Sequence, residues 1–278
     1  MSAMTNSNIE TIQCIYFSPT GTTRRTVEAI AEGTGLRIAD SIDITLPAPR
    51  ERWDGSTQGD LIIVGVPVYS GTIPSHPLDS LHRLEGNGRW AVPVAVYGVR
   101  SAEDTVGQLS GLLRTRGFRV LAAANFVAEH SYSHDKLPLA LGRPDKRDLE
   151  TAREFGSKIA EKLESHPDEL PLESRPLKYG ENYRRKREEW PENRRPGSTT
   201  RVSDYDEKKC IKCNICVETC PSGAIDPKTY AIDDANCTRC FACTRVCPTG
   251  VRTTQLSPRA MTFFTELLNV KKEPKIFI

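Results

Sequence analysis

Eight of the nine cysteines lie within residues 210–247, in a motif that occurs twice. In each copy, three cysteines are separated by two residues, and a fourth follows after three more residues, directly before a proline. The members are Cys210, Cys213, Cys216 and Cys220 in the first copy and Cys237, Cys240, Cys243 and Cys247 in the second. Because a chain of 278 residues can bury an adequate core without disulfides, the cluster indicates metal ligands. Zinc is the alternative to iron–sulfur chemistry, but zinc ligands usually come as separated cysteine pairs.

A hydroxyl-rich turn, SPTGTT, follows the first apolar run and precedes a helical pattern. Ser18, Thr20, Thr22 and Thr23 offer hydroxyl donors, and Gly21 allows the backbone to approach an anion closely. The N-terminus of the following helix adds a favourable field for negative charge. The turn does not match the G-x-x-x-x-G-K-[ST] pattern of ATP and GTP sites, and the chain contains no G-x-G-x-x-G. Neutral donors around one phosphate fit a monophosphate such as FMN.

Apolar runs and helical patterns alternate over the first 165 residues. The expected strands cover residues 11–17, 36–45, 61–66, 91–97 and 119–127. The expected helices cover residues 22–31, 101–116 and 145–163, the second beginning with a capping-box pattern at Ser101. Near-continuous apolar strands that alternate with helices are typical of a doubly wound parallel sheet in an α/β fold.

The chain divides into four parts. Residues 8–165 form the expected α/β domain, and residues 166–202 are predicted to be a proline-rich basic linker. Residues 203–255 form a compact cysteine domain whose two halves repeat with a 27-residue period. Residues 256–278 are expected to form a helix, starting after Ser257, and a tail. The helix docks either on the cysteine domain or on the sheet domain.

The first domain resembles the flavodoxins, because the turn at residues 18–23 satisfies their [ST]-x-T-G-x-T pattern. The segments VPVYSGTIP and NFVAEHSYS strengthen the resemblance. It implies strand order 2-1-3-4-5 and an FMN site built by loops at the carboxyl ends of three strands, in which Tyr69 is the candidate stacking aromatic. Tyr69 and Tyr97 are equally open to interpretation as core aromatics. The expected FMN-binding residues are Ser18, Pro19, Thr20, Gly21, Thr22, Thr23, Pro67, Val68, Tyr69, Ser70, Gly71, Tyr97, Gly98, Val99, Arg100 and Asp104.

The cysteine domain resembles the bacterial ferredoxins that hold two [4Fe–4S] clusters in an α+β fold. In that family, the fourth cysteine of each motif binds the cluster of the other motif. The resemblance therefore assigns Cys210, Cys213, Cys216 and Cys247 to one cluster and Cys237, Cys240, Cys243 and Cys220 to the other. As a whole, the chain resembles the flavodoxin–ferredoxin fusions that are common in anaerobes.

This resemblance implies an electron-transfer protein that uses FMN and two [4Fe–4S] clusters and exchanges electrons with a redox partner protein. The alternative is an enzyme, an FMN-dependent reductase of a small molecule that receives electrons through its own ferredoxin domain. A roomy apolar pocket lined by residues 67–74 and 130–134 would favour the enzyme. His130 and His134 are expected either near the flavin or the cluster interface, or as hydrogen-bonded loop residues. Cys14, inside the first strand, is expected to be a small buried side chain.

The overall charge excludes some partners. The formal net charge is +2, from 38 basic and 36 acidic residues, so bulk charge does not indicate nucleic acid or an anionic membrane. No apolar run approaches the roughly 18 residues of a spanning helix, and the first residues lack the pattern of a secretion signal. A cytoplasmic protein is therefore expected, and the sequence does not indicate its oligomeric state.

Overall fold

The computed structural model describes residues 9–165, 167–173, 200–203 and 205–278. Most of the predicted linker, residues 166–202, therefore lies outside the described residues. The described part of the chain contains no helix with the length and apolar character that crossing a membrane requires.

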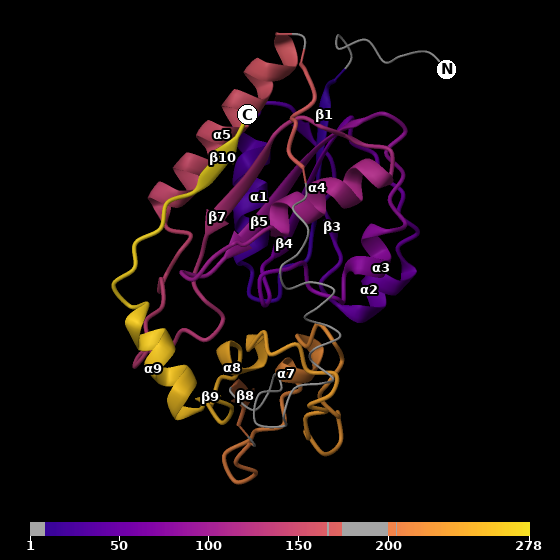
Figure 1. The fold of residues 1–278 in the computed structure, drawn as a ribbon. Helices are drawn as coiled ribbons and strands as arrows, with labels where there is room; N and C mark the ends of the chain where they lie inside the picture. The colour runs from indigo at the N-terminus through magenta and orange to yellow at the C-terminus, as the bar shows by residue number, and fades with distance from the viewer. Residues whose placement is uncertain (1–8, 166, 174–199, 204) are drawn as a thin grey trace.

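The first domain is built on a parallel sheet (Figure 1). Its strands are β1 (Thr11–Tyr16), β2 (Arg37–Ile38), β3 (Ile42–Asp43), β4 (Leu61–Pro67), β5 (Trp90–Tyr97), β6 (Arg119–Val120) and β7 (Ala123–Val127). Strands β7, β5, β4, β1 and β2 are neighbours in that order and run parallel to one another. With the short strands β3 and β6 counted as parts of their edge segments, this is the predicted order 2-1-3-4-5. The predicted flavodoxin-like α/β fold is therefore confirmed.

The second and the fifth predicted strands are interrupted where the sequence pattern predicts single runs. Strands β2 and β3 both pair with β1, and strands β6 and β7 both pair with β5. The three central strands, in contrast, are buried along nearly their whole length. Strands β2 and β3 lie at an edge of the sheet, where a strand has fewer neighbours to hold its register and short kinks cost less than in the centre.

Helices cover both faces of the sheet, as apolar strands buried on both sides require. Helices α1 (Thr22–Gly33) and α5 (Lys146–Glu164) bury Ile30 and Phe155 on one face, against Ile63 and other residues of the sheet. Helix α4 (Thr105–Thr115) buries Leu109 on the other face, where the short helices α2 (Pro47–Arg52) and α3 (Leu78–Leu81) also lie. Cys14 is completely buried on the α1 face, and burial raises the pKa of its thiol to about 12. The prediction that Cys14 is a small core residue is therefore confirmed.

The second domain repeats one backbone unit. Helices α7 (Ile215–Glu218) and α8 (Ala242–Arg245) are 27 residues apart at both ends, which is the period of the sequence repeat. Strands β8 (Thr200–Val202) and β9 (Thr254–Leu256) pair antiparallel beside these two halves. The domain lies beyond one end of the parallel sheet (Figure 1).

The C-terminal segment returns to the sheet domain. Ser257 caps helix α9 (Pro258–Glu266) by accepting a hydrogen bond from the Ala260 amide, as predicted. Strand β10 (Lys275–Phe277) then pairs antiparallel with β7 and covers the outer edge of the sheet. The tail is thus the sixth position of the sheet, a strand that the sequence patterns do not predict.

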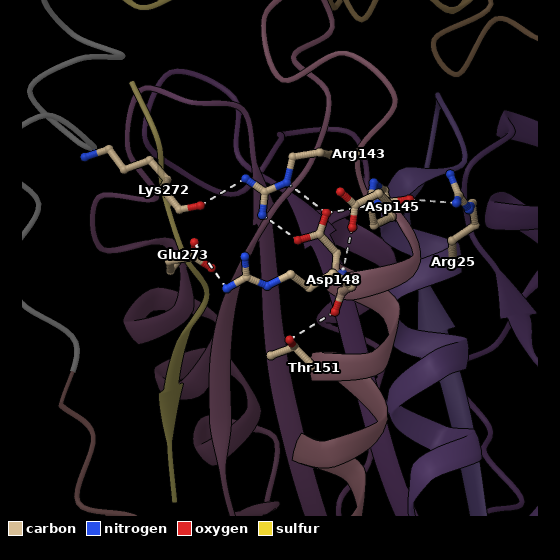
Figure 2. Close-up of polar contacts among 9 residues, drawn as sticks. Arg25, Arg143, Asp145, Asp148, Thr151, Lys272 and Glu273 are labelled. Atoms are coloured by element: carbon tan, nitrogen blue, oxygen red, sulfur yellow. Dashed lines mark hydrogen bonds and ion pairs between the residues drawn. The ribbon is translucent and has the colours of Figure 1, made fainter. Parts of the chain in front are cut away.

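An arginine network anchors this returning tail (Figure 2). Arg143 Nε donates to Asp148 Oδ2 at 2.8 Å, and Arg143 Nη1 donates to the backbone oxygen of Lys272 at 2.9 Å. Asp148 is 7% exposed and also belongs to the capping box of α5 with Asp145. Burial alone would raise the pKa of Asp148, but hydrogen bonds from Arg143 and the Asp145 backbone outweigh it and lower the pKa. One buried carboxylate therefore links the start of α5 to the tail.

Candidate functional site

The three predicted loops gather at one edge of the sheet. They follow β1, β4 and β5, which are adjacent parallel strands, so their carboxyl ends meet at the same edge. This is the edge at which open α/β sheets bind ligands. The structure thus brings together residues 18–23, 67–71 and 97–104.

The first loop forms a tight turn that leads into α1. Gly21 has φ +78°, a conformation that a side chain would strain, and its amide donates to the Ser18 backbone oxygen at 3.1 Å. Ser18 Oγ accepts a hydrogen bond from the Arg24 amide at 3.0 Å and so serves the first turn of the helix. The Thr20 and Thr22 hydroxyls lie 3.5 Å apart. Pro19 completes the turn between them and β1.

Thr23 has a buried hydroxyl without a partner among the described residues. The residue is 1% exposed, and its Oγ1 makes no hydrogen bond there. A buried hydroxyl without a partner costs on the order of 1–3 kcal/mol. Thr23 is the last position of the [ST]-x-T-G-x-T pattern, so this unpaired donor fits a phosphate bound at the turn.

The second loop reverses the chain after β4. Tyr69 and Thr72 exchange backbone hydrogen bonds at 3.1 and 3.2 Å, and Ser70 and Gly71 between them have φ of +55° and +82°. Pro67 is the buried last residue of β4, and the side chain of Val68 packs into the core. Of the five predicted residues in this loop, Tyr69, Ser70 and Gly71 therefore lie in the turn itself.

The third loop, residues 97–104, presents backbone at the edge of the sheet, while some of its side chains are buried. Gly98 lies directly against the ring of His130, where even a Cβ would come within 2.4 Å of the imidazole. Val99 is 4% exposed and packs with residues of α9, so only its backbone faces the loop edge. Arg100 pairs with Glu103 at 3.4 Å. Tyr97 ends β5, half-buried, and Asp104 is the N-cap residue of α4.

The first cysteine set comprises Cys210, Cys213, Cys216 and Cys247. These four residues line one pocket, together with Ile211, Ile215, Tyr230 and Arg252. The structure therefore places Cys247, from the second motif, with the three leading cysteines of the first motif. Cys213 is exposed, and the other three are half-buried.

The second cysteine set comprises Cys220, Cys237, Cys240 and Cys243. Cys240 and Cys243 are buried, at 6% and 8% exposure. Burial raises the pKa of Cys240 to about 11 and that of Cys243 to about 12, and the charges of Cys220 and Cys237 add to both shifts. These thiols lie close enough together for each to raise the pKa of the others. The positive charge of bound iron would stabilise their thiolate forms.

The arrangement of the described cysteines does not match a site for a single metal ion. No three His, Cys, Asp or Glu side chains in the described ranges are arranged to hold a single ion. Zinc needs its sulfur ligands about 2.3 Å from one centre. The first cysteine set instead surrounds a pocket, an arrangement that fits a multi-atom iron–sulfur cluster better than zinc.

Backbone conformation in the two motifs supports the same interpretation. Lys212 and Asn214 have φ of +54° and +62°, and the equivalent Arg239 and Phe241 both have +57°. Non-glycine residues rarely adopt positive φ, and turns of this kind direct backbone amides toward an anionic guest. Both copies show the same conformations 27 residues apart. The positive φ angles are therefore a property of the motif.

An ion pair connects the cysteine domain to the sheet domain. Arg245, at the end of α8, donates to Glu129 Oε1 and to the His130 backbone oxygen, each at 2.8 Å. Glu129 is 13% exposed and uses its other oxygen to accept from the Gly142 amide. Long-range contacts of this kind leave no local signal, and the sequence patterns do not predict them.

A second polar contact lies on the other side of the interface. The buried Arg50 donates from Nη1 to the Thr45 backbone oxygen at 2.8 Å and to the Pro221 backbone oxygen at 3.1 Å. Burial lowers the pKa of Arg50. Pro221 directly follows Cys220, so this contact fixes the chain next to a member of the second cysteine set.

Aromatic rings also pack against one another across the interface. Tyr132 of the sheet domain meets Phe241 of the cysteine domain edge to face, with ring centroids 5.0 Å apart. His130 and Tyr132 also contact Phe264 of α9, at 5.0 and 5.2 Å. Burial lowers the pKa of His130 to about 4, with smaller effects from Arg245 and Arg100. His130 is thus a neutral interface residue. His134 instead lies in a short turn, where its Nδ1 accepts from the Lys136 amide.

Tyr69 relates the second loop to the second cysteine set. The residue is half-buried, and burial raises the pKa of its phenol well above the ordinary range. The charges of Cys240 and Tyr132 raise it further, whereas that of Arg245 lowers it. The phenol of the predicted stacking residue is therefore within electrostatic reach of Cys240.

Comparison with protein families supports the assignment of the second domain. Residues 209–251 match the model of the 4Fe-4S dicluster domain family. A comparison with curated proteins found no match.

Solved structures similar to this chain cover its first domain. A flavodoxin from the domain Archaea shares 19% identity, covering 55% of this chain and 99% of its own, with a TM-score of 0.38. The flavodoxin of Streptococcus pneumoniae TIGR4 shares 20% identity with the same coverage and a TM-score of 0.41. Rubredoxin oxygen:oxidoreductase from Desulfovibrio gigas shares 16% identity, covering 58% of this chain and 37% of its own, with a TM-score of 0.40.

Proposed function

We propose that this fusion of a flavodoxin-like domain and a 4Fe-4S dicluster domain carries electrons between FMN and two [4Fe–4S] clusters. The observation that carries the proposal is the interface, which packs the second cysteine set beside the loops at the carboxyl edge of the sheet. Arg50, Glu129 and Arg245 hold this arrangement through the polar contacts described above. Electron transfer needs redox centres close together, and the packing of the second cysteine set against the carboxyl edge of the sheet supports the proposal for that reason.

The residues of the sheet domain have distinct roles in this proposal. The turn at residues 18–23 would bind the phosphate through backbone amides and hydroxyls, including the Thr23 hydroxyl, which has no partner in the part of the chain that the structure describes. The turn at residues 69–71 and the backbone of residues 98–100 would flank the ring system. When bound, the flavin supplies a centre that exchanges two electrons, whereas each iron–sulfur cluster exchanges one. Arg100 brings a positive charge to this edge, which would favour a reduced, anionic ring.

The same interface favours an electron carrier over a small-molecule reductase. A reductase would need an open pocket between residues 67–74 and 130–134. In the structure, Tyr132 of the second segment packs on Phe241 and Phe264, and Tyr69 of the first segment is half-buried. Phe241 of the cysteine domain and Phe264 of α9 therefore take up part of the space beside residues 130–134 that a substrate would need.

The proposal is tested on protein purified without oxygen. We expect an absorption spectrum with flavin and iron–sulfur bands, about eight iron atoms per chain for two cubane clusters, and FMN in the material released by heat. Stepwise reduction should then bleach the flavin and the cluster bands in the same preparation. Zinc in place of iron would contradict the proposal, as would cluster reduction that leaves a bound flavin oxidised at every applied potential.

A further inference from the structure

Arg252 is a buried cation beside the first cysteine set. The residue is 3% exposed and lines the pocket that the four cysteines of this set share. Its guanidinium donates from Nη2 to the Tyr230 backbone oxygen and lies over the Tyr205 ring, with Cζ 5.4 Å from the ring centroid. The positive charge of Arg252 is therefore held inside the domain, next to the cysteines and away from water.

No carboxylate in the described part of the chain forms an ion pair with Arg252. The ion pairs of the cysteine domain use three other cations, Lys209, Arg239 and Arg245. The carbonyl oxygen and the phenol ring that the Arg252 guanidinium contacts are both uncharged. Because a buried charge without a counter-ion is strongly unfavourable, the pocket beside Arg252 suits an anionic guest.

The internal repeat supplies a comparison for Arg252. The residue 27 positions earlier is Ile225, which follows the proline and glycine of the first motif as Arg252 follows those of the second. Ile225 is 4% exposed and packs with Cys220 and Cys243 of the second cysteine set. The same position of the repeat thus lies beside each set, with an aliphatic side chain at one and a cation at the other. The motif itself therefore does not require the positive charge that Arg252 brings to the first set.

We infer that Arg252 is the counter-ion of an iron–sulfur cluster at the first cysteine set and that it raises the reduction potential of this cluster. The inference rests on the proposed function, which requires a [4Fe–4S] cluster there. With four thiolates, the oxidised cluster carries a charge of about −2, and reduction takes it to about −3. One electron enters from the second cluster or an added reductant, which is oxidised by one electron, and no bond forms or breaks. The more negative product gains more from a nearby cation, and burial strengthens the attraction.

A redox titration of the oxygen-free holoprotein with dithionite tests the inference. Arg252→Gln removes the charge but keeps a donor for the Tyr230 backbone oxygen, whereas Arg252→Lys keeps the charge. In Arg252→Gln, the one-electron equilibrium of the first cluster should shift about tenfold toward the oxidised form, which is a fall of about 59 mV in its potential. Arg252→Lys should retain most of the wild-type potential. Electron paramagnetic resonance of Cys213→Ser, which loses a ligand of the first set, identifies the couple that belongs to this cluster.

Arg201→Gln is the matched control. It removes the same formal charge from the same domain, but Arg201 is exposed on β8, where water and salt screen its charge. The potential of the first cluster should therefore stay at the wild-type value in this variant. Release of iron from the oxidised holoprotein to a chelator gives a second measure. It should be faster than in the wild type in Arg252→Gln, and close to the wild-type rate in Arg252→Lys and Arg201→Gln.

The possible outcomes separate charge from shape. An unchanged potential in Arg252→Gln, or an equal fall in Arg252→Lys or Arg201→Gln, would overturn the inference while leaving the proposed function intact. If Arg252→Gln holds only about four iron atoms per chain, Arg252→Lys decides: about eight atoms would show that the cluster needs the charge, and about four would overturn the inference. Wild-type protein without iron–sulfur clusters would overturn the proposed function first.

Discussion

Arg245 and Glu129 form an ion pair between the two domains, with Nη1 and Oε1 2.8 Å apart. The arginine lies two residues after Cys243, and the glutamate lies two residues after β7 ends. The second cysteine set and the carboxyl edge of the sheet are thus joined through side chains placed directly beside each of them.

Removing the charge of Glu129 should weaken this junction. We expect Glu129→Gln to lower the free energy of unfolding by about 1–2 kcal/mol, because the partly buried Arg245 loses its charged acceptor. Chemical denaturation, followed through both domains, measures the change. Glu28→Gln is the control, since the exposed pair Arg24–Glu28 contributes about 0.5 kcal/mol or less. Equal losses in the two variants would show that the interdomain pair contributes no more than a surface pair.

The interface should also be sensitive to mild acid through His130. Its folded pKa of about 4 lies below the ordinary value of 6.5, so the unfolded chain takes up a proton first as the pH falls. Neutral His130 therefore stabilises the fold fully above pH 6.5, and this contribution is lost as the pH falls toward 4. Between pH 7 and pH 5 the loss amounts to about 2 kcal/mol.

The measurement for His130 is a difference between two proteins. Denaturation of the wild type and of His130→Gln at pH 7, 6 and 5 cancels the titration of all other groups. The stability difference between the wild type and the variant should shrink as the pH falls. A constant difference over this range would mean that His130 titrates normally in the folded protein.

Asp148 should control the attachment of the C-terminal strand. In Asp148→Asn, Arg143 loses its charged partner while keeping its bond to the Lys272 backbone oxygen, and we expect a loss of about 2–3 kcal/mol. Hydrogen exchange of the β10 amides should become faster than in the wild type. Lys272→Ala is the control, because the contact uses the backbone oxygen and not the lysine side chain. Unchanged hydrogen exchange of the β10 amides in Asp148→Asn would show that the arginine network does not hold the strand in place.

Thr23 offers a test of the phosphate turn. Thr23→Val keeps the side-chain shape but removes the buried hydroxyl, which has no partner among the described residues. Without flavin, the variant should be as stable as the wild type or slightly more stable, whereas its FMN affinity should fall about tenfold for one lost hydrogen bond. Thr26→Val is the control, because the Thr26 hydroxyl bonds to the backbone of its own helix. FMN fluorescence titration gives both affinities, and equal values would remove Thr23 from the site.

The sequence patterns predict the sheet and its helices well because both depend on burial. The main strands and the three long helices follow from apolar periodicity, and the strand order follows from the resemblance to the flavodoxins, yet the start of α4 differs from the prediction. The capping pattern at Ser101 does not begin a helix, since the Ser101 hydroxyl accepts from the Glu103 amide and the helix starts at Thr105. A serine followed by acidic residues suits a local turn as well as a cap, and the sequence alone does not separate the two.

The residues of the candidate site also differ in how far the sequence predicts them. The cysteine motifs and the hydroxyl-rich turn are contiguous in sequence, so their residue types and spacing point to their chemistry directly. Arg50, Tyr132 and Glu129 act through partners more than 100 residues away in the chain. No local pattern encodes such contacts, and the pairing of β10 with β7 is hidden for the same reason.

The return of the chain to the sheet domain means that the cysteine domain is attached to it on both sides. Residues 170–172 already lie on that domain, where Leu170 bonds to Val120 and Arg114 holds the backbone oxygens of Leu170 and Leu172. Strand β10 ties down the other flank. The cysteine domain is therefore an insertion that is tethered to the sheet domain at both ends. The two tethers keep the effective concentration of the cysteine domain at the interface high when one contact breaks. Redocking after a transient opening then becomes an intramolecular event that dilution does not slow.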